Sequence, residues 1–136
     1  MTYLLDTNAC IALINGIPRR VRARFERATA SRNSAAVSTV TAFELWYGAA
    51  KSTRREANAR RVETFLAGPL ELWMLEDGDA QVAGEVRAAL EKSGRPIGAY
   101  DVLIAGQGLR RQATVVTAHA TELARVPGLR WEDWAK

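Results

Sequence analysis

Three carboxylates lie in apolar stretches of this sequence, where a charged side chain is difficult to justify. Asp6 ends the run YLL, Glu44 lies within AFELW, and Asp101 lies within AYDVLI. An unpaired carboxylate in apolar packing is costly and tends to protonate unless a partner compensates its charge. Three such groups brought together would repel one another unless a divalent cation neutralised them. Because all the donors are oxygens, the cation that they favour is Mg²⁺ or Mn²⁺.

The chain offers little to other kinds of catalytic chemistry. It has one cysteine, Cys10, and one histidine, His119, which excludes an internal disulfide, a cysteine-based zinc site and a site with several imidazoles. We expect Cys10 to be a small buried residue of the first helix. No Ser/His/Asp or Cys/His arrangement supplies a protein nucleophile. The residue types therefore favour water activated by a metal that is held mainly by oxygen.

Each carboxylate also has a structural interpretation. Asp6 could be the N-cap of the helix that follows it, the segment from Thr41 to Glu44 has the spacing of a capping box, and Asp101 could favour the dipole at a helix start. All three interpretations place an acid at the first turn of a helix next to a strand. Helix starts gather along the carboxyl edge of a parallel sheet, so these interpretations lead to the same place as the functional one.

The pattern of apolar residues predicts the elements that carry these acids. Strands are expected at 3–5, 35–38, 70–74 and 114–117, with a weaker fifth at 129–131. Amphipathic stripes predict helices over 19–30, 54–67 and 78–92, the last with Val82, Val86, Ala89 and Leu90 on one side, and a further helix is expected over 99–112. Strands that alternate with helices imply a mostly parallel sheet covered on both faces. Ligands of such sheets bind beyond the carboxyl ends of the strands.

Length and composition indicate one globular domain over residues 1–136. The chain is 48% hydrophobic and 25% charged, which excludes a collagen-like, low-complexity or wholly disordered chain. The segment MTYLLDTN has no basic leader, and no later segment approaches the ~18 apolar residues of a membrane span. We therefore expect a cytoplasmic protein.

Positive charge is concentrated in the N-terminal half. Residues 1–61 carry 11 Lys and Arg against 4 Asp and Glu, whereas residues 62–136 carry 8 against 11. The arginines fall in two runs, within 19–27 and 54–61. These runs could attract the phosphates of a nucleic acid, or they could be two solvated helix faces.

Four motifs, in this order and spacing, resemble the VapC toxins of the PIN-domain ribonucleases. They are YLLDTN at 3–8, STVTAFELWYG at 38–48, PIGAYDVLIA at 96–105, and VT at 116–117 followed by VPGL and Trp134. The resemblance covers essentially the whole chain. It implies a PIN-like three-layer α/β/α sandwich and a Mg²⁺-dependent endoribonuclease that cuts tRNA or rRNA to arrest translation and growth. It also implies that Asp6, Glu44 and Asp101 are the acidic triad that holds the metal.

The resemblance implies partners as well. Members of the family pair with an antitoxin, usually VapB, whose C-terminal segment blocks the site, and they commonly form homodimers or larger assemblies with the antitoxin. Phe43, Trp46 and Tyr47 could form an apolar surface for the antitoxin or for a second subunit. Alternatively, at least one of them is a core residue of the helix that carries Glu44.

His119 departs from the family's pattern. The family often has Asp or Asn two residues after the threonine that matches Thr117. A neutral imidazole could still bind a metal or a water molecule, but a lone histidine at a helix start is also typical of a cap or an exposed polar residue. Glu122 lies one helical turn further on and could reach the same edge, although the helix dipole explains it equally well. Candidate donors to the carboxylates or to phosphate, each of which could instead satisfy backbone groups at a strand end, are Thr7, Asn8, Ser38 and Thr117.

Two other functions remain open at this point. A PIN-like module without catalytic activity could bind RNA or a protein, and His119 is the best support for that reading. Chelation separates it from a nuclease, because binding to phosphate responds mainly to salt. An aspartyl-phosphate phosphatase is the third candidate, since Asp6 follows a first strand. Such an enzyme needs a second acid two residues on, and Asn8 occupies that place.

Overall fold

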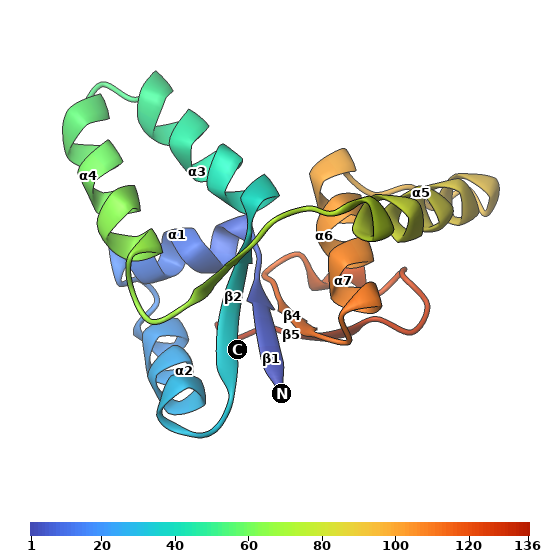
Figure 1. Ribbon diagram of the computed structural model, residues 1–136, viewed down its shortest axis with the longest axis horizontal. Helices are drawn as coiled ribbons and strands as arrows, with labels where there is room; N and C mark the ends of the chain where they lie inside the picture. The colour runs from blue at the N-terminus through green and yellow to red at the C-terminus, as the bar shows by residue number, and fades with distance from the viewer.

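The computed structural model describes residues 1–136 and contains a single five-stranded sheet with seven helices (Figure 1). All neighbouring strands are parallel, in the order β3-β2-β1-β4-β5. The strands are β1 (Thr2–Leu5), β2 (Ser34–Ser38), β3 (Glu71–Trp73), β4 (Thr114–Val116) and β5 (Arg130–Glu132). The helices are α1 (Thr7–Asn15), α2 (Arg19–Ala30), α3 (Thr39–Lys51), α4 (Arg55–Leu66), α5 (Asp77–Lys92), α6 (Ala99–Arg110) and α7 (Ala120–Leu123).

The helices cover the sheet on both sides, as Figure 1 shows. Helices α1 to α4 lie to one side of the strands and α5 to α7 to the other. Two separate cores result, one that joins the sheet to α1, α2, α3 and α4, and one that joins it to α6 and α7. The predicted three-layer α/β/α sandwich is thus confirmed.

The central strands are buried on both faces, which explains why their sequences are continuously apolar. Leu4 and Leu5 of β1 face opposite cores and are both fully buried, as expected for a parallel sheet between two helical layers. The outer strand β3 differs, because its Leu72 is 51% exposed, and Met74 directly after the strand is 71% exposed. The strand is shorter than the predicted 70–74, and the predicted weak strand at 129–131 lies one residue further on, as β5.

Helix α5 packs against α6, and this contact corrects one sequence prediction. The buried side of α5 consists of Asp79, Ala83 and Leu90, which lie on one helical stripe. Ala89, predicted on that stripe, is exposed. The two helices approach closely at Gly106, where an added Cβ would lie 2.6 Å from the Ala83 backbone nitrogen.

The strand order places the chain's direction change between β1 and β4. From β1 the chain moves outward through β2 and β3, and it then crosses to β4 and β5 on the other side. Ligands of open parallel sheets bind at this kind of switch point, beyond the carboxyl ends of the strands. The backbone N–H of Asp6 donates to the carbonyl of Val116 at 3.0 Å, so the ends of β1 and β4 are held together there. None of the helices has the length and apolar composition needed to span a membrane.

Candidate metal centre

A cavity of about 240 Å³ lies at the carboxyl end of the sheet and brings the three predicted carboxylates together. Asp6 comes from the end of β1, Glu44 from α3 and Asp101 from α6. The residues that line the cavity are Asp6, Thr7, Asn8, Glu44, Gly98, Ala99, Tyr100, Asp101 and His119. Acids that are up to 95 positions apart in the chain therefore share one site.

Asp6 is held rigidly at the base of this site. It is the N-cap of α1, and its Oδ1 accepts a hydrogen bond of 2.9 Å from the backbone N–H of Ala9. The residue is only 4% exposed. Burial raises the pKa of its carboxyl above the usual value, against the opposing effects of the Thr117 hydroxyl, the Ala9 N–H and the charge of His119; the nearby Glu44 raises it further. The predicted N-cap is confirmed, and the same carboxylate still faces the cavity.

Glu44 does not take part in the capping box suggested by its sequence. Helix α3 begins at Thr39, and its N-cap is Ser38, whose Oγ accepts from the backbone N–H of Val40 at 3.1 Å. Glu44 therefore lies in the second turn, too far along to reach the helix start. Its Oε1 accepts a hydrogen bond of 2.6 Å from the Thr7 hydroxyl, which fixes the carboxylate toward α1 and the cavity.

Asp101 lies in the first turn of α6, as predicted. Burial raises the pKa of its carboxyl to about 6; the charge of His119 lowers it, and Asp6 and Glu122 raise it further. Its side chain is 24% exposed, so it remains open to a ligand. An acid with this pKa is one whose negative charge the surrounding protein does not fully compensate.

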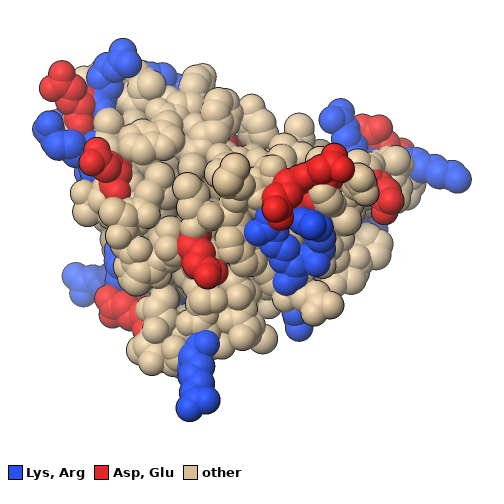
Figure 2. Space-filling view, viewed as in Figure 1, with Lys and Arg blue, Asp and Glu red and all other residues tan.

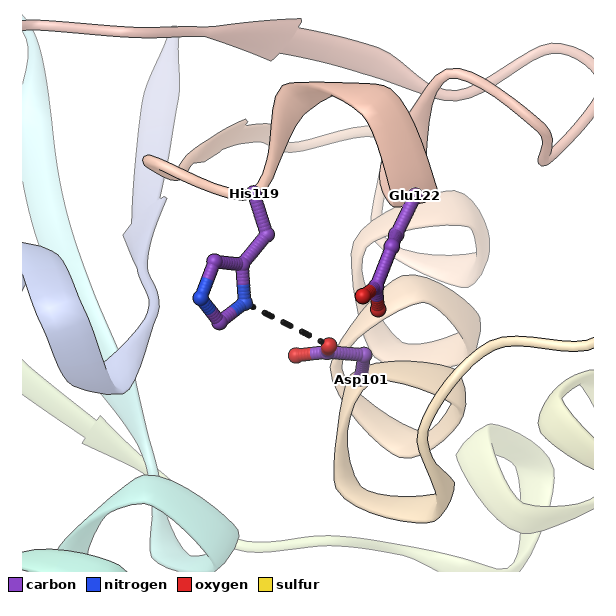
Figure 3. Close-up of side chains that lie close together, drawn as sticks. All are labelled: Asp101, His119 and Glu122. Carbon is purple, nitrogen blue, oxygen red and sulfur yellow. Dashed lines mark ion pairs between the residues drawn. The ribbon is translucent and has the colours of Figure 1, made fainter.

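His119 occupies the N-cap position of α7, but its side chain makes no capping hydrogen bond. Its ring points into the site instead, with Nε2 at 2.7 Å from Asn8 Nδ2 and Nδ1 at 3.6 Å from Asp101 Oδ2. Figure 3 shows the imidazole and the carboxylates of Asp101 and Glu122 directed toward one another from α6 and the β4–α7 segment. Ligand atoms of these three residues lie within 4.8 Å of one another. His119 is thus the N-cap of α7 by position without acting as a side-chain cap, and the alternative of an exposed polar residue agrees with its side chain, which is 47% exposed.

The other predicted donors divide into two kinds. Thr7 and Asn8 line the cavity and contact Glu44 and His119. Ser38 and Thr117 do not line it, and their hydroxyls accept from backbone N–H groups, that of Thr117 from His119 at 2.7 Å. Both hydroxyls thus satisfy backbone groups at the strand ends, the structural alternative given by the sequence, and the Thr117 hydroxyl also acts on the Asp6 carboxylate, whose pKa it lowers.

The donor set suits a divalent cation. No lysine or arginine lines the cavity, and His119 is the one side chain of its lining that can carry a positive charge against three carboxylates. Burial is the main cause of the raised pKa values of Asp6 and Asp101, and the negative charges near each of them raise these values further. A divalent cation would provide the missing charge, and carboxylate oxygens are ligands that Mg²⁺ and Mn²⁺ accept.

Aromatic side chains at the rim of the cavity are more exposed than a core position allows. Phe43, Trp46 and Tyr47 are 52%, 41% and 56% exposed, so the core interpretation is wrong for all three. Phe43 stacks on Tyr47 and meets the edge of Tyr100, at ring centroid distances of 6.3 and 5.8 Å. Sequence reasoning missed Tyr100, and its position directly before Asp101 was the available signal.

The two arginine runs partly share one surface. Arg22 of α2 and Arg60 and Arg61 of α4 line a second cavity, of about 540 Å³, together with apolar residues of α1, α2 and α4. A smaller cavity next to it reaches from Arg61 to Glu44. The arginine surface is therefore joined to the carboxylate cavity along α1, α3 and α4.

A second cluster of charges lies where α5 begins and α6 ends. Asp79 is fully buried, and its carboxylate receives hydrogen bonds from Arg111 at 2.8 Å and Arg110 at 3.1 Å. Burial alone would raise the pKa of Asp79, but the hydrogen bonds from Arg111, from the Glu76 backbone and from Arg110 outweigh it and hold the pKa below its usual value. In Figure 2, acidic and basic side chains lie against one another near the meeting point of α5 and α6.

A parallel sheet with acids gathered at its carboxyl edge defines an α/β protein with a candidate metal site at the switch point of the sheet, and comparison with known families gives the class more narrowly. The PIN domain family matches residues 3–129, and the chain belongs to that family. It is 40% identical over 134 residues to the "tRNA(fMet)-specific endonuclease VapC" of Salmonella typhimurium, covering 98% of both chains. It is 37% identical over 136 residues to "Ribonuclease VapC2" of Rickettsia felis, covering both chains completely.

Solved structures of related complexes have the same fold. VapBC2 from Rickettsia felis, bound to a DNA fragment from its promoter, matches with a TM-score of 0.92 at 35% identity over 98% of this chain and 99% of that one. DNA-bound VapBC from Salmonella typhimurium matches with a TM-score of 0.89 at 40% identity over 98% of both chains. The relatives are thus VapC ribonucleases of toxin–antitoxin pairs, which confirms the resemblance read from the four motifs.

Proposed function

We propose that this chain is a VapC-type toxin, a metal-dependent endoribonuclease that hydrolyses RNA phosphodiester bonds in the cytoplasm. The observation that carries the proposal is the convergence of Asp6, Glu44 and Asp101 on one cavity that no lysine or arginine lines. The names of the full-length relatives, which are ribonucleases and tRNA endonucleases, support the same activity.

In this proposal Asp6, Glu44 and Asp101 hold Mg²⁺ or Mn²⁺ at the carboxyl edge of the sheet. A bound divalent cation lowers the pKa of a water molecule and stabilises charge on the leaving oxygen. The chain's own groups prepare the site. The Ala9 N–H and the Thr7 hydroxyl fix the carboxylates of Asp6 and Glu44 in place, so little reorganisation is needed when RNA binds.

Cleavage in the presence and absence of a chelator tests the activity. The purified chain should cut RNA with Mg²⁺ or Mn²⁺, stop when EDTA is added, and recover when the cation is restored in excess. The Asp6→Asn variant, which keeps an N-cap residue at the start of α1, should not cut. Cleavage that persists in EDTA would refute the metal mechanism. RNA binding without cleavage in any divalent cation would favour the binding module.

We further propose that the RNA is a tRNA, with the initiator tRNA as first candidate, since the Salmonella typhimurium relative is named a tRNA(fMet)-specific endonuclease. Loss of that tRNA would arrest translation and growth. Mapping 5′ ends of cellular RNA after brief induction identifies the target, with the Asp101→Asn form as control. A discrete break in a tRNA supports the proposal, whereas discrete breaks in rRNA alone would contradict it.

A VapB-type antitoxin is the partner that we propose. The solved structures of the Rickettsia felis and Salmonella typhimurium relatives are toxin–antitoxin complexes. The arginine-lined cavity at α1, α2 and α4 suits an apolar segment that carries acidic residues. The cognate antitoxin should suppress cleavage, and Arg61→Glu should weaken that suppression. Equal suppression of the parent and the variant would place the contact elsewhere.

The exposed aromatic residues of α3 suit a second copy of the chain, and we propose a homodimer that uses Phe43, Trp46 and Tyr47. Light scattering of the parent and of Trp46→Ala tests this interface. A folded variant that is monomeric, beside a dimeric parent, supports it. A variant that stays dimeric contradicts it.

A further inference from the structure

We propose that Tyr100 is the residue against which an unpaired base of the RNA stacks, next to the phosphate that the carboxylate cavity binds. The inference deepens the proposed nuclease function and rests on it. It assigns a role to a side chain that the metal chemistry does not use. It also gives the substrate one property, since the base beside the scissile phosphate must lie outside a double helix.

The position of Tyr100 places its ring beside the metal ligands. It directly precedes Asp101 in the first turn of α6, and both residues line the same cavity. Consecutive Cα atoms are about 3.8 Å apart, so the ring and any cation that Asp101 holds are neighbours on one wall of the cavity. A base whose phosphate binds that cation therefore lies within reach of the ring.

Within this cavity Tyr100 is the one large apolar side chain. The other lining residues are acidic, polar or small, and Tyr100 is 46% exposed. A nucleobase has an apolar face and polar edges, so it suits a single aromatic ring that is surrounded by polar groups such as the amide of Asn8. An apolar peptide side chain would find no further apolar surface here, and an acidic one would meet three carboxylates.

Phe43 holds the ring of Tyr100 in place. The two ring centroids lie 5.8 Å apart, with an angle of 67° between the ring planes, which is an edge-to-face arrangement that stabilises aromatic pairs. The contact joins α6 to α3, the helix that carries Glu44. The ring is thus fixed before RNA binds, which lowers the entropic cost of stacking a base on it.

The other two rings of this aromatic row are less suited to the same role. Tyr47 already has Phe43 stacked on it at 6.3 Å, and Nζ of Lys51 lies 4.9 Å from its ring centroid. Neither Phe43 nor Tyr47 lines the carboxylate cavity. Tyr100 is therefore the end of the row that faces the site, and the part of the row on α3 stays available to a second copy of the chain.

Stacking on Tyr100 favours an unpaired strand over a duplex. Every base has an apolar face, so the contact tolerates any sequence, but a base can use it only when it has left its own helix. The contact is uncharged, and its contribution to affinity should persist when added salt weakens the contacts to phosphate.

Photocrosslinking identifies the side chain that a base contacts. A single-stranded oligoribonucleotide of 5-iodouridine is bound in Mn²⁺ to the Asp6→Asn chain, which should not cut it, and the crosslinked residue is found by mass spectrometry after irradiation. We expect the crosslink at Tyr100 and its loss when Tyr100→Leu is added. A crosslink at Phe43 or Tyr47 instead, or no crosslink at all, would overturn the proposal.

The affinity for oligouridine measures the contribution of the ring. In the Asp6→Asn background, Tyr100→Leu should weaken binding of the single strand about tenfold, at low and at high salt, and leave binding of an RNA duplex unchanged. Tyr100→Phe keeps the aromatic face and should bind as well as the background chain. Trp131→Leu, at an exposed aromatic residue of β5, is the matched control and should also bind the single strand unchanged. No loss in Tyr100→Leu, or an equal loss for strand and duplex, would overturn the proposal.

Light scattering and cleavage separate this inference from the other proposals. Tyr100→Leu should keep the oligomeric state of the parent, and a monomeric variant beside a dimeric parent would assign the ring to the subunit contact and overturn the inference. Cleavage of RNA by the parent without a crosslink at Tyr100 would leave the nuclease proposal standing while this inference fails. A crosslink at Tyr100, in a chain whose parent form does not cut RNA, would support the base contact and refute the nuclease proposal.

Discussion

Two aspartates in this molecule, Asp79 and Asp101, have opposite electrostatic surroundings. Asp79 is fully buried, yet two arginines contact its carboxylate and its pKa lies below the usual value. Asp101 is partly open and no arginine or lysine lines its cavity, so burial raises its pKa to about 6. The same side chain is therefore neutralised within the protein at one position and left uncompensated at the other.

The difference separates a structural acid from one that is prepared for a ligand. At Asp79 the protein supplies the counter-charges, and what results is a contact that joins α5 to the end of α6. At the carboxylate cavity His119 is the only basic side chain beside three carboxylates, and such a concentration of acidic charge is typical of functional sites. A bound cation would offset that charge, and the comparison therefore predicts opposite responses to mutation, pH and metal.

Removing the uncompensated acid should have the largest effect on activity. We expect Asp101→Asn to lower RNA cleavage by about a thousandfold or more, because a ligand of the metal is lost. Without metal, Asp101→Asn should be at least as stable as the parent, because the substitution removes a negative charge that the neighbouring carboxylates repel. Cleavage rates and urea unfolding of the two proteins measure both effects.

Glu85→Gln is the matched control, because it also removes one acidic charge, at an exposed position of α5. It should leave the cleavage rate and the stability unchanged. If Asp101→Asn cut RNA as fast as this control, Asp101 would not be a metal ligand.

Removing Asp79, whose charge the arginines compensate, should instead lower the stability of the fold. Asp79→Ala removes the buried carboxylate that ties Arg110 and Arg111 to the start of α5, although both arginines, 40% and 21% exposed, still pair with Glu76. We expect a lower midpoint of urea unfolding and, in the fraction that is folded, an unchanged cleavage rate. A stable variant with reduced cleavage would reverse the comparison and make Asp79 part of the catalytic machinery.

Divalent cations should stabilise the protein through the carboxylate cavity and not through the Asp79 cluster. Saturating Mg²⁺ or Mn²⁺ should raise the thermal midpoint of the parent, because an ion that binds the folded state stabilises it by about 2.7 kcal/mol at a hundred times its Kd. In Asp79→Ala the cation should raise the thermal midpoint by the same amount, from a lower value without cation. In Asp101→Asn the cation should change the thermal midpoint little. An increment that persists in Asp101→Asn would place the ion outside the cavity.

In the metal-free protein, Asp101 and Asp79 should also make contributions to the free energy of unfolding that change in opposite directions with pH. The folded chain keeps the Asp101 proton that the unfolded chain has released, so this residue's contribution to the free energy of unfolding falls as pH rises from 3.8 to about 6. Asp79, with a lowered pKa, stabilises the fold above pH 3.8 and loses that contribution as pH falls further.

Urea unfolding across this pH range checks both signs. The stability advantage of Asp101→Asn over the parent should grow between pH 3.8 and about 6, and the disadvantage of Asp79→Ala should shrink below pH 3.8. Parallel profiles for the two variants would show that their surroundings do not differ as described.

The sequence predicted the cavity better than it predicted the arginine cluster, for a physical reason. Asp6, Glu44 and Asp101 stand within apolar runs, and the alternation of strands and helices brings such positions to one edge of the sheet. Asp79 lies in the polar stretch EDGDAQ, and its burial depends on Arg110 and Arg111, more than thirty residues away. Nothing local to the stretch indicates that α5 turns this acid toward α6.

The directions of the side chains at the site could not be predicted from the sequence either. The spacing from Thr41 to Glu44 fits a capping box, but the N-cap of α3 is Ser38, three residues before Thr41, so Glu44 is free to meet Thr7. His119 was predicted near the site without a known role, because the path of the chain after β4 decides where its ring points. Local patterns thus located the site, while tertiary contacts determined how its groups are oriented.

The smallest effect that we predict concerns the support of Glu44. Thr7→Val keeps the side-chain shape but removes the hydroxyl that donates to Glu44 Oε1 at 2.6 Å. The carboxylate then loses its orientation and gains freedom, and we expect kcat/KM to fall about tenfold. Thr7→Ser, which restores a hydroxyl, should recover most of the loss. Because the role is one of positioning, a higher concentration of Mn²⁺ should partly rescue Thr7→Val but not Asp101→Asn. Equal activity of Thr7→Val and the parent would show that the carboxylate cavity, unlike the Asp79 cluster, does not depend on its supporting hydrogen bonds.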